Sequence, residues 1–321
     1  MRQIFVALFI ISLSFVSCEK ATSCEEVPET VKVKFEIDSA TKSVSDIDKD
    51  RIETIDVFVF VPGTGQMITY DHMQGNAISL YLQRGLLRDY YFFANAPEGV
   101  FDEVRCLSDL LNLISGLEDN RRVFVMHAHT SLTFMADSEL KIEVSRLCSK
   151  IVIDKIVPKF MESNLTEYEV MLKRVFLMNV GSEMDYSGNL VDSKTFYNVS
   201  GYDPSLSNDL KSLISYEMNR PIYDASVIED DVFVYCYTRD TKKDSISNTK
   251  LVLEVEIAGI SNYYTMQLPR LEPNHEYFIE TIRLLGFGSA EPGDNIDRIE
   301  VSFDLDINDW GEANENDTVM E

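Results

Sequence analysis

Short segments of β-strand length recur along almost the whole chain, and this feature most restricts its fold. From residue 31 the sequence VKVKFEID alternates apolar and polar residues, which is the period of a strand with one buried face. Other segments of this kind are separated by turn residues; they include AISLYLQ, DYYFFANA, DVFVYCYTR, TKLVLEVEIAG and RIEVSFDLDINDW. Many short strands divided by turns predict an all-β chain built from β-sandwiches.

Turn and helix signals interrupt the strands at a few places. IDVFVFVPGTGQMITYD predicts a hairpin whose turn contains Pro62–Gly65. Residues 106–117 have helical spacing, and Gly116 is the expected end of that helix. Within a polar, loop-rich stretch at 181–229, SLSNDLKSLIS predicts a second short helix. The apolar face of the first helix consists of Leu107, Leu110, Leu111 and Ile114.

A long apolar segment at mid-chain divides the sequence into two domains. Residues 140–157 are too many for an ordinary strand, and SRLCSK in their middle breaks the alternation. We expect this segment to contain the last strand of one domain and the first strand of the next. The sequence therefore predicts an N-terminal β-sandwich at 31–150, a C-terminal β-sandwich at 151–310 and an acidic, frayed tail at 311–321.

The first 17 residues have the layout of a bacterial secretory signal peptide. Arg2 precedes an apolar run at residues 4–16 that is too short to span a bilayer. The sequence FVSC at 15–18 resembles a lipobox, the signal after which the cysteine is acylated and becomes the new N-terminus, although Phe15 stands where leucine is usual. We expect a signal peptide at 1–17, a covalent lipid on Cys18 and a lipidated tether at 18–30. In the alternative, an ordinary signal peptidase cuts nearby and Cys18 is incidental or forms a disulfide.

The chain is strongly acidic, with 54 acidic and 29 basic residues and a net charge of −25. Such a surface repels nucleic acid and gains nothing from anionic lipid headgroups, so we attribute the charge to solubility. Apolar runs after the signal peptide have only strand length, so we expect no membrane-spanning segment.

Four cysteines remain after Cys18, and they allow three disulfide connectivities among which the sequence does not choose. None forms the C-x-x-C pair of a zinc site. Two of the four lie in apolar strands, where buried free thiols are at least as reasonable as disulfides. The four are Cys24, Cys106, Cys148 and Cys236.

Motifs that would indicate catalysis or metal binding are weak. His127 and His129 are placed on one face of a strand, but the sequence supplies no third ligand at a recognisable spacing. No G-x-S-x-G is present, and GFGS at 286–289 is a turn rather than a phosphate-binding loop. The aromatic runs DYYFFANA and SNYYTM indicate core packing more than a stacking platform for glycans. We therefore expect no catalytic residue, no cofactor, no metal and no enzymatic activity.

Five segments follow one another along the mature chain: IDVFVFVPGTGQMI, DYYFFANAPEG, SRLCSKIVIDKI, LEPNHEYFIETIRLLG and VSFDLDINDW. Their order resembles that of the fimbrillin-like anchor-subunit family of Bacteroidetes fimbriae over nearly the whole mature chain. The resemblance implies two transthyretin-like β-sandwich domains in tandem, with few short helices. It also implies a lipid-anchored position at the base of a fimbrium in the outer membrane, and no cofactor beyond the lipid on Cys18. In stalk relatives a protease removes the first strand, and a strand of a neighbouring subunit replaces it.

The predicted tether suggests why an anchor would differ from a stalk subunit. A cut at Lys42 or Arg51 would release the lipid together with the first strand, so we expect an anchor to keep that strand and to bind the filament through another edge. The candidate is the segment 298–310, whose other role is to close the second sandwich. Its alternating apolar residues are Ile299, Val301, Phe303, Leu305 and Ile307.

The sequence thus predicts a lipid-anchored fimbrial subunit that attaches a cell-surface fimbrium to the outer membrane and limits its length. Its expected partners are stalk or other fimbrillin-like subunits, bound by strand addition. The alternative is a surface glycan-binding lipoprotein of a polysaccharide-uptake system.

Overall fold

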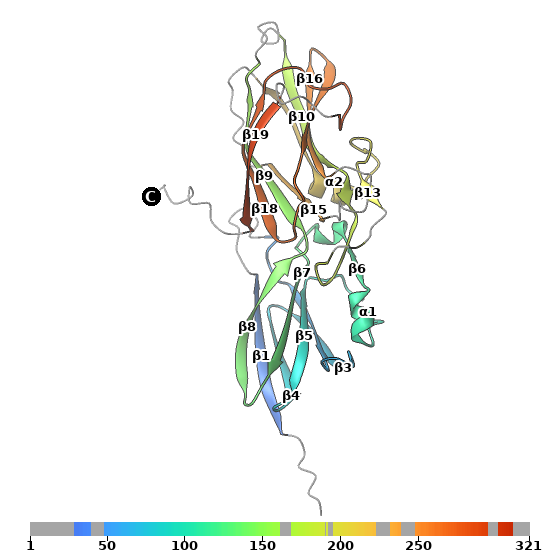
Figure 1. Cartoon of the computed structure of the whole chain (residues 1–321), viewed down its shortest axis with the longest axis vertical. Coiled ribbons are helices and arrows are strands. Elements are labelled where there is room, and N and C mark those ends of the chain that lie inside the picture. The colour runs from blue at the N-terminus through green and yellow to red at the C-terminus, as the bar shows by residue number, and fades with distance from the viewer. Residues whose placement is uncertain are drawn as a thin grey trace, which may run out of the picture.

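The computed structural model describes residues 29–39, 48–160, 168–189, 191, 195–222, 232–238, 248–294 and 301–310. These residues form an elongated molecule with two lobes, and the first lobe contains the N-terminal strands (Figure 1). Strands make up most of both lobes, so the all-β prediction is confirmed. Among the described residues, none of the helices has the length and apolar content needed to cross a membrane.

The first lobe is one seven-stranded sheet that bends into two facing layers. Its order is β3-β2-β5-β7-β8-β1-β4, and β1 pairs in parallel with β8. Strands β7 and β8 pair only where Met126 and His127 meet the end of β8, so the sheet bends at this point. The strands are β1 (Thr30–Ser39), β2 (Thr54–Phe60), β3 (Met67–Gln74), β4 (Ala77–Gln83), β5 (Leu87–Ala94), β7 (Met126–Thr133) and β8 (Ser138–Arg146). The predicted hairpin is confirmed as β2 and β3.

Aromatic side chains fill the space between the two layers of this lobe. Phe35 of β1 lies with its ring centroid 5.6 Å from that of Tyr90 and 5.1 Å from that of Phe92, both on β5. Phe134, after β7, closes the end of the cluster at 5.9 Å from Phe35. The alternation predicted from residue 31 is therefore real, because every second side chain of β1 enters this core.

The second lobe consists of two four-stranded sheets. One has the order β15-β9-β18-β19 and the other β14-β10-β16-β17. As in the first lobe, the first strand, β9, runs parallel to a late strand, β18. The strands are β9 (Ser149–Pro158), β10 (Val170–Met178), β14 (Ser215–Ile222), β15 (Val232–Cys236), β16 (Lys250–Ile257), β17 (Ile260–Gln267), β18 (His275–Leu284) and β19 (Val301–Asp309). The transthyretin-like topology and the domain bounds stay predictions.

Short elements near the junction of the lobes correct one expectation, and the second lobe contains an unexpected strand. The predicted helix at 106–117 is wrong beyond Leu111, because Ile114–Gly116 forms β6 and pairs with β12 of the other lobe. The second predicted helix is confirmed as α2. The polar stretch at 181–229 also contains β14, an edge strand that hydrophobic periodicity does not reveal. The remaining elements are α1 (Leu107–Leu111), η2 (Leu117–Asn120), β11 (Val180–Gly181), β12 (Glu183–Asp185), β13 (Phe196–Tyr197) and α2 (Asn208–Ile214).

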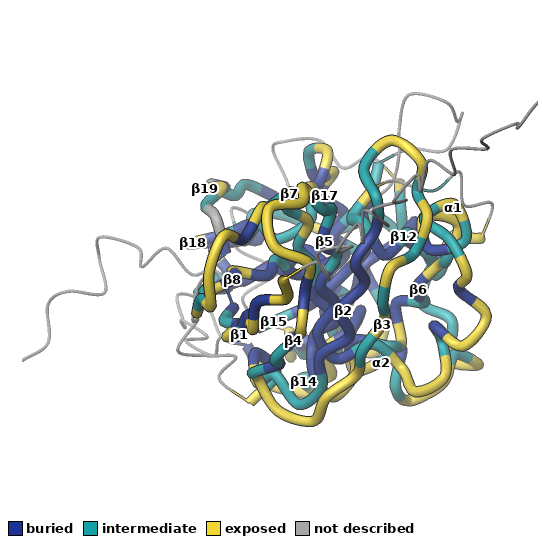
Figure 2. Tube along the Cα trace, turned by 90° about the horizontal axis from the view of Figure 1, so that it is seen from below, coloured by how far each residue is buried: buried dark blue, intermediate teal, exposed yellow. Residues whose placement is uncertain are grey.

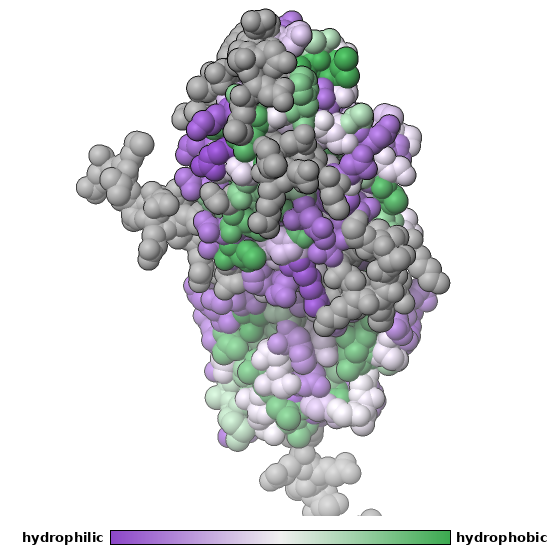
Figure 3. Space-filling model, turned by 45° about the horizontal axis from the view of Figure 1, so that its top comes forward, coloured by the Kyte–Doolittle hydropathy of each residue, from purple (hydrophilic) through white to green (hydrophobic). Residues whose placement is uncertain are grey.

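Exposed loops enclose buried strands when the molecule is viewed along its long axis (Figure 2). On the face drawn in Figure 3, hydrophobic residues form separate patches with hydrophilic residues between them. Inside the molecule one large cluster of buried hydrophobic residues extends through both lobes, beside a small second cluster, whereas apolar side chains on this face are dispersed.

A buried polar cluster joins the lobes where β8 ends and β9 begins. Arg146 has no exposed surface, and its Nε and a terminal nitrogen both lie 2.7 Å from Asp50 Oδ1. The guanidinium also lies 4.5 Å from the ring centroid of Trp310, which follows β19. Asn274, before β18, accepts a hydrogen bond of 3.1 Å from Arg146. Segments from both lobes therefore meet around one buried cation.

Candidate functional site

Strand β19 is the described part of the candidate subunit-binding segment, and we call the side of it that pairs with no described strand its free edge. On one side β19 pairs antiparallel with β18, and no strand among the described residues pairs with its other side. An unpaired edge presents backbone N–H and C=O groups that a strand from another chain can bind. The described part of the predicted segment therefore closes the sheet as its edge strand, and its role in strand addition stays a prediction.

The apolar side chains of β19 become more exposed toward its C-terminal end. Val301 is buried, Phe303 and Leu305 are partly buried against the core, and Ile307 is 52% exposed. Ile299, the fifth residue of the predicted set, lies outside the described residues. The apolar surface near the end of the strand is therefore that of Ile307.

Trp310 fixes the end of β19 at the junction of the lobes. Its ring is fully buried and lies 4.9 Å from the ring of Phe124 in the first lobe. The backbone N–H of Trp310 donates a 3.0 Å hydrogen bond to the Asn274 carbonyl. Release of β19 from its sheet would therefore disturb the contact between the lobes.

The first strand is deeply integrated in its sheet. Strand β1 lies between β8 and β4, and Val31, Val33, Phe35 and Ile37 on its inner face are all buried. Its removal would open a groove between two strands that do not otherwise pair. This groove is where the resemblance to stalk subunits would place an incoming strand.

Of the two positions considered for a cut, which we expect an anchor to avoid, the structure describes only Arg51. Arg51 is exposed and bonds to Glu53, but it directly follows Asp50, the buried partner of Arg146. A cut at Arg51 followed by loss of the strand would leave Arg146 without this carboxylate. Lys42 lies outside the described residues.

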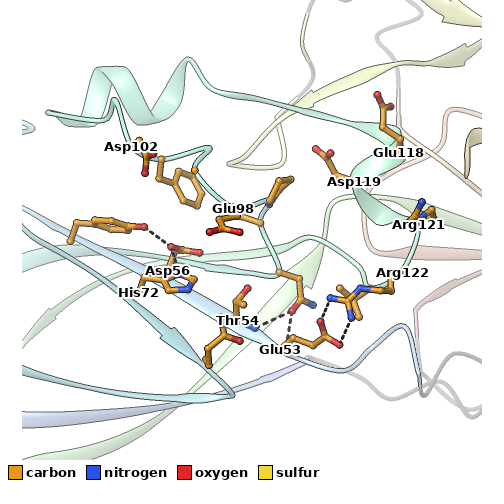
Figure 4. Close-up of a pocket in the computed structure, with 18 of the residues that line it drawn as sticks. Glu53, Thr54, Asp56, His72, Glu98, Asp102, Glu118, Asp119, Arg121 and Arg122 are labelled. Atoms are coloured by element: carbon orange, nitrogen blue, oxygen red, sulfur yellow. Dashed lines mark hydrogen bonds and ion pairs between the residues drawn. The ribbon is translucent and has the colours of Figure 1, made fainter.

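A pocket of about 710 Å³ is lined by β2, β3, the loop after β5, η2 and the start of α2 (Figure 4). On one wall Asp56 is buried, accepts a 2.7 Å hydrogen bond from the Tyr70 hydroxyl and lies 2.9 Å from Nδ1 of His72. On the other side Glu53 pairs with Arg51 and Arg122. Most of the pocket's acidic groups thus have partners within the protein.

Burial and pairing shift the pKa values of the pocket's groups in different directions. Hydrogen bonds from Arg51, and then the charge and hydrogen bond of Arg122, hold the pKa of Glu53 below its usual value. Burial raises the pKa of Asp119, although the Ser115 hydroxyl donates a 3.0 Å hydrogen bond to it. Burial raises the pKa of the Tyr70 phenol most, and the hydrogen bond from Tyr70 to Asp56 raises it further. Among the described groups that line the pocket, no nucleophile is paired with a base.

The two histidines of the H-x-H motif have packing roles. His129 stacks on Tyr91 with ring centroids 4.2 Å apart. His127 packs so closely on Gly188 that a Cβ there would lie 2.6 Å from Nε2. Within the part of the chain that the structure describes, no three His, Cys, Asp or Glu side chains are grouped to hold a metal ion.

Cys148 and Cys236 are both fully buried, as their apolar neighbours suggest. Cys236 pairs in register with Ser149, the residue after Cys148, and burial together with the nearby Cys148 raises the pKa of its thiol. Cys106 is partly exposed. Cys24, the signal peptide, Cys18 and the acidic tail lie outside the described residues, so the expectations about them stay predictions.

The aromatic run DYYFFANA belongs to the core, as expected. Tyr90, Phe92 and Phe93 are almost completely buried, and Tyr91 is covered by His129. In SNYYTM, Tyr264 is buried as well. These runs do not form an exposed stacking face.

Comparison with known structures finds the same fold in fimbrial and adhesion proteins. A Bacteroides eggerthii protein described as a cell adhesion protein matches 88% of this chain and 96% of its own, with 16% identity and a TM-score of 0.67. The fimbrilin FimA of Porphyromonas gingivalis matches 90% of this chain and 100% of its own, with 12% identity and a TM-score of 0.63. The tip fimbrial protein Mfa3 of the same species, in a C-terminally truncated form, matches 88% of this chain and 100% of its own, with 14% identity and a TM-score of 0.57.

No family model matches the sequence, and neither does any curated protein. The likeness therefore concerns the fold, and it extends over both lobes. The chain has the two-lobed fold of fimbrial and cell adhesion proteins of Bacteroidetes, as its resemblance to the fimbrillin-like family implied.

Proposed function

We propose that this chain is a lipid-anchored fimbrial subunit that attaches a surface filament to the outer membrane. The observation that supports the proposal is the agreement in fold of about nine-tenths of the chain with the fimbrilin FimA and the tip fimbrial protein Mfa3. The proposed role is structural rather than catalytic. The lipid is the one predicted on Cys18, since a lipobox-like sequence ends at that residue.

The two proposed attachment points belong to different lobes. The described chain enters the first lobe at Glu29, immediately before β1, whereas the free edge of β19 belongs to the second lobe. A lipid on the tether and a filament on β19 would thus act on separate parts of the molecule. The partner would be a stalk or other fimbrillin-like subunit that adds a strand to this edge.

If the chain keeps β1 in its sheet, as proposed for an anchor, it would limit the length of the filament. In a subunit whose first strand stays in the sheet, no groove opens for the strand of another subunit. Loss of the segment up to Arg51 would also remove Asp50 from Arg146. The chain would therefore end the filament at the membrane rather than extend it in both directions. The glycan-binding alternative has less support, because the aromatic runs on which it depends are buried.

Replacement of Cys18 by Ala tests the anchor directly. We expect the variant to leave the membrane fraction and filaments to detach from cells, because stable attachment requires the acyl chains. Membrane fractionation and counting of cell-bound filaments measure the two effects, and mass spectrometry of the mature N-terminus identifies the lipid. Cys106→Ala is the control for loss of a thiol. A Cys18→Ala protein that stays in the envelope with filaments firmly attached would disprove the proposal.

A further inference from the structure

Three segments meet at the end of the first lobe that is remote from the second lobe. The N–H of Arg84, after β4, donates a 2.9 Å hydrogen bond to the carbonyl of Glu29. The N–H of Gly85 donates a 2.8 Å bond to the carbonyl of Phe134, after β7. We call residues 29–32, 83–88 and 133–138 the tip. The described chain therefore begins within this tip.

Apolar side chains are exposed at and beside the tip. Leu86 is 40% exposed, Leu87 is 51% exposed and Met135 is 60% exposed, while Tyr81 on the adjoining β4 is 73% exposed. Met135 lies over the neighbouring turn, because a Cβ on Gly85 would be 3.7 Å from its sulfur. Single exposed apolar residues are common on protein surfaces, but here they gather on adjoining turns at one end.

The charge of the tip differs from that of the rest of the chain. Its 16 residues include three basic and two acidic ones, a formal charge of +1, whereas the whole chain carries −25 over 321 residues, an average of about −1 for every 16. Arg84 pairs with Glu29 at 2.5 Å, and Asp137 accepts a 2.8 Å hydrogen bond from the backbone N–H of Lys32. A lipid surface that repels the remainder of the protein would not repel this end. The five charged residues are Glu29, Lys32, Arg84, Arg88 and Asp137.

The tether predicted before Glu29 is short. Residues 19–28 separate it from Cys18, and ten residues span at most about 35 Å when fully extended. A lipid on Cys18 would therefore keep the tip within one tether length of the bilayer, whereas the second lobe lies at the other end of the molecule (Figure 1).

We propose that the tip is a membrane-docking surface that inserts Leu86, Leu87 and Met135 into the boundary between headgroups and acyl chains. The occupant is the lipid surface to which the tether leads, and the inference rests on the proposed acylation of Cys18. Apolar side chains lower their free energy at this boundary, and a nearly neutral rim removes the electrostatic penalty. Docking would orient the long axis away from the membrane and present β19 to a filament.

Quenching by brominated lipids tests this contact. The acylated full chain carrying Leu87→Trp is placed in vesicles of phosphatidylethanolamine and phosphatidylcholine with brominated acyl chains. The matched control is Ile260→Trp, an exposed residue of the second lobe. The native Trp310 is buried and contributes the same background fluorescence in both variants. We expect at least a twofold loss of the added emission and a blue shift for Leu87→Trp, and less than a tenth lost for Ile260→Trp.

Each outcome decides between the proposals. Equal quenching of the two variants, with Cys18 acylation verified by mass spectrometry in the same sample, would overturn tip docking and leave the anchor intact. If the emission of Leu87→Trp shifts to the blue only after a filament subunit is added, tip docking would be overturned in favour of a protein interface. An unacylated N-terminus would reject the anchor, and docking with it. If Leu87→Trp fails to fold, Met135→Trp on the adjacent turn replaces it.

Discussion

Arg146 shows how much of the molecule can depend on one buried cation. Its partners come from the segment before β2, from the loop before β18 and from the residue after β19. A buried charge is tolerated only when it is paired and hydrogen bonded, so removal of one partner costs more than the pair itself contributes. The junction of the lobes is therefore most sensitive at Asp50.

We expect Asp50→Ala to lower the free energy of unfolding by about 3 kcal/mol or more, because Arg146 would remain buried without its carboxylate. Urea titration followed by Trp310 fluorescence measures the change. Arg84→Ala is the control, since its partner Glu29 is exposed and such pairs contribute about 1 kcal/mol or less. The double variant Asp50→Ala/Arg146→Met should recover most of the loss. Equal effects of the two single variants would contradict this view of the junction.

His127 should make stability depend on pH near neutrality. Burial lowers the pKa of its imidazole below the usual value near 6.5, so between these pKa values the unfolded chain binds more protons than the folded one. Stability is then fully present above the unfolded pKa and is lost as the pH falls. We expect the melting temperature of His127→Gln to fall less between about pH 7.5 and about pH 5.5 than that of the wild type. His129→Gln is the control, because His129 is exposed on the same strand. Identical pH profiles of the wild type and the two variants would contradict the prediction.

At the scale of elements, periodicity predicted the strands that have one buried face. The alternation in β1 follows from local sequence, because this strand buries every second residue. The hairpin of β2 and β3 follows from its turn residues, although β2 is buried along nearly its whole length and β3 is not. Sequence reasoning missed β14, whose outer residues are polar and whose Pro221 suits only an edge. It also extended α1 too far, because the pairing of β6 with β12 depends on residues some 70 positions away.

The candidate sites also divide into features that local sequence predicts and features that depend on distant residues. The β19 edge was accessible to pattern analysis, although the lack of a described strand on its outer side is a property of the whole sheet. The pocket beside Asp56 and the polar cluster at Arg146 bring together residues from several distant segments. In a chain with 54 acidic residues, spacing alone does not distinguish these carboxylates from the others.

Ile307→Lys tests the free edge of β19 without removing the strand. Ile307 is 52% exposed, so the variant should fold normally while a charge on the edge opposes addition of an apolar strand. We expect binding of a partner subunit to weaken tenfold or more, which corresponds to about 1.4 kcal/mol. Ile260→Lys, at a 68% exposed isoleucine that begins β17, is the control in a binding titration. Equal affinity for both variants would mean that the filament uses another edge.

At the scale of the whole molecule, the net charge of −25 should oppose compactness. Salt screens this repulsion, because the Debye length falls from about 30 Å at 0.01 M to about 3 Å at 1 M. We therefore expect the melting temperature at neutral pH to rise with sodium chloride between these concentrations. Calorimetry near pH 4.5, where the net charge vanishes, is the control and should show little effect. A fall of the melting temperature with salt at neutral pH would mean that specific ion pairs outweigh the repulsion.

The order of the strands gives the molecule a continuous path for mechanical load. Strand β19 is hydrogen bonded to β18, β18 to β9, and β9 follows directly from β8, which is hydrogen bonded to β1. Tension between a filament on β19 and a tether before β1 would cross these pairs mainly along the strands. Rows of backbone hydrogen bonds would then be sheared together instead of opening one after another, which is the stronger arrangement for a protein held at both ends.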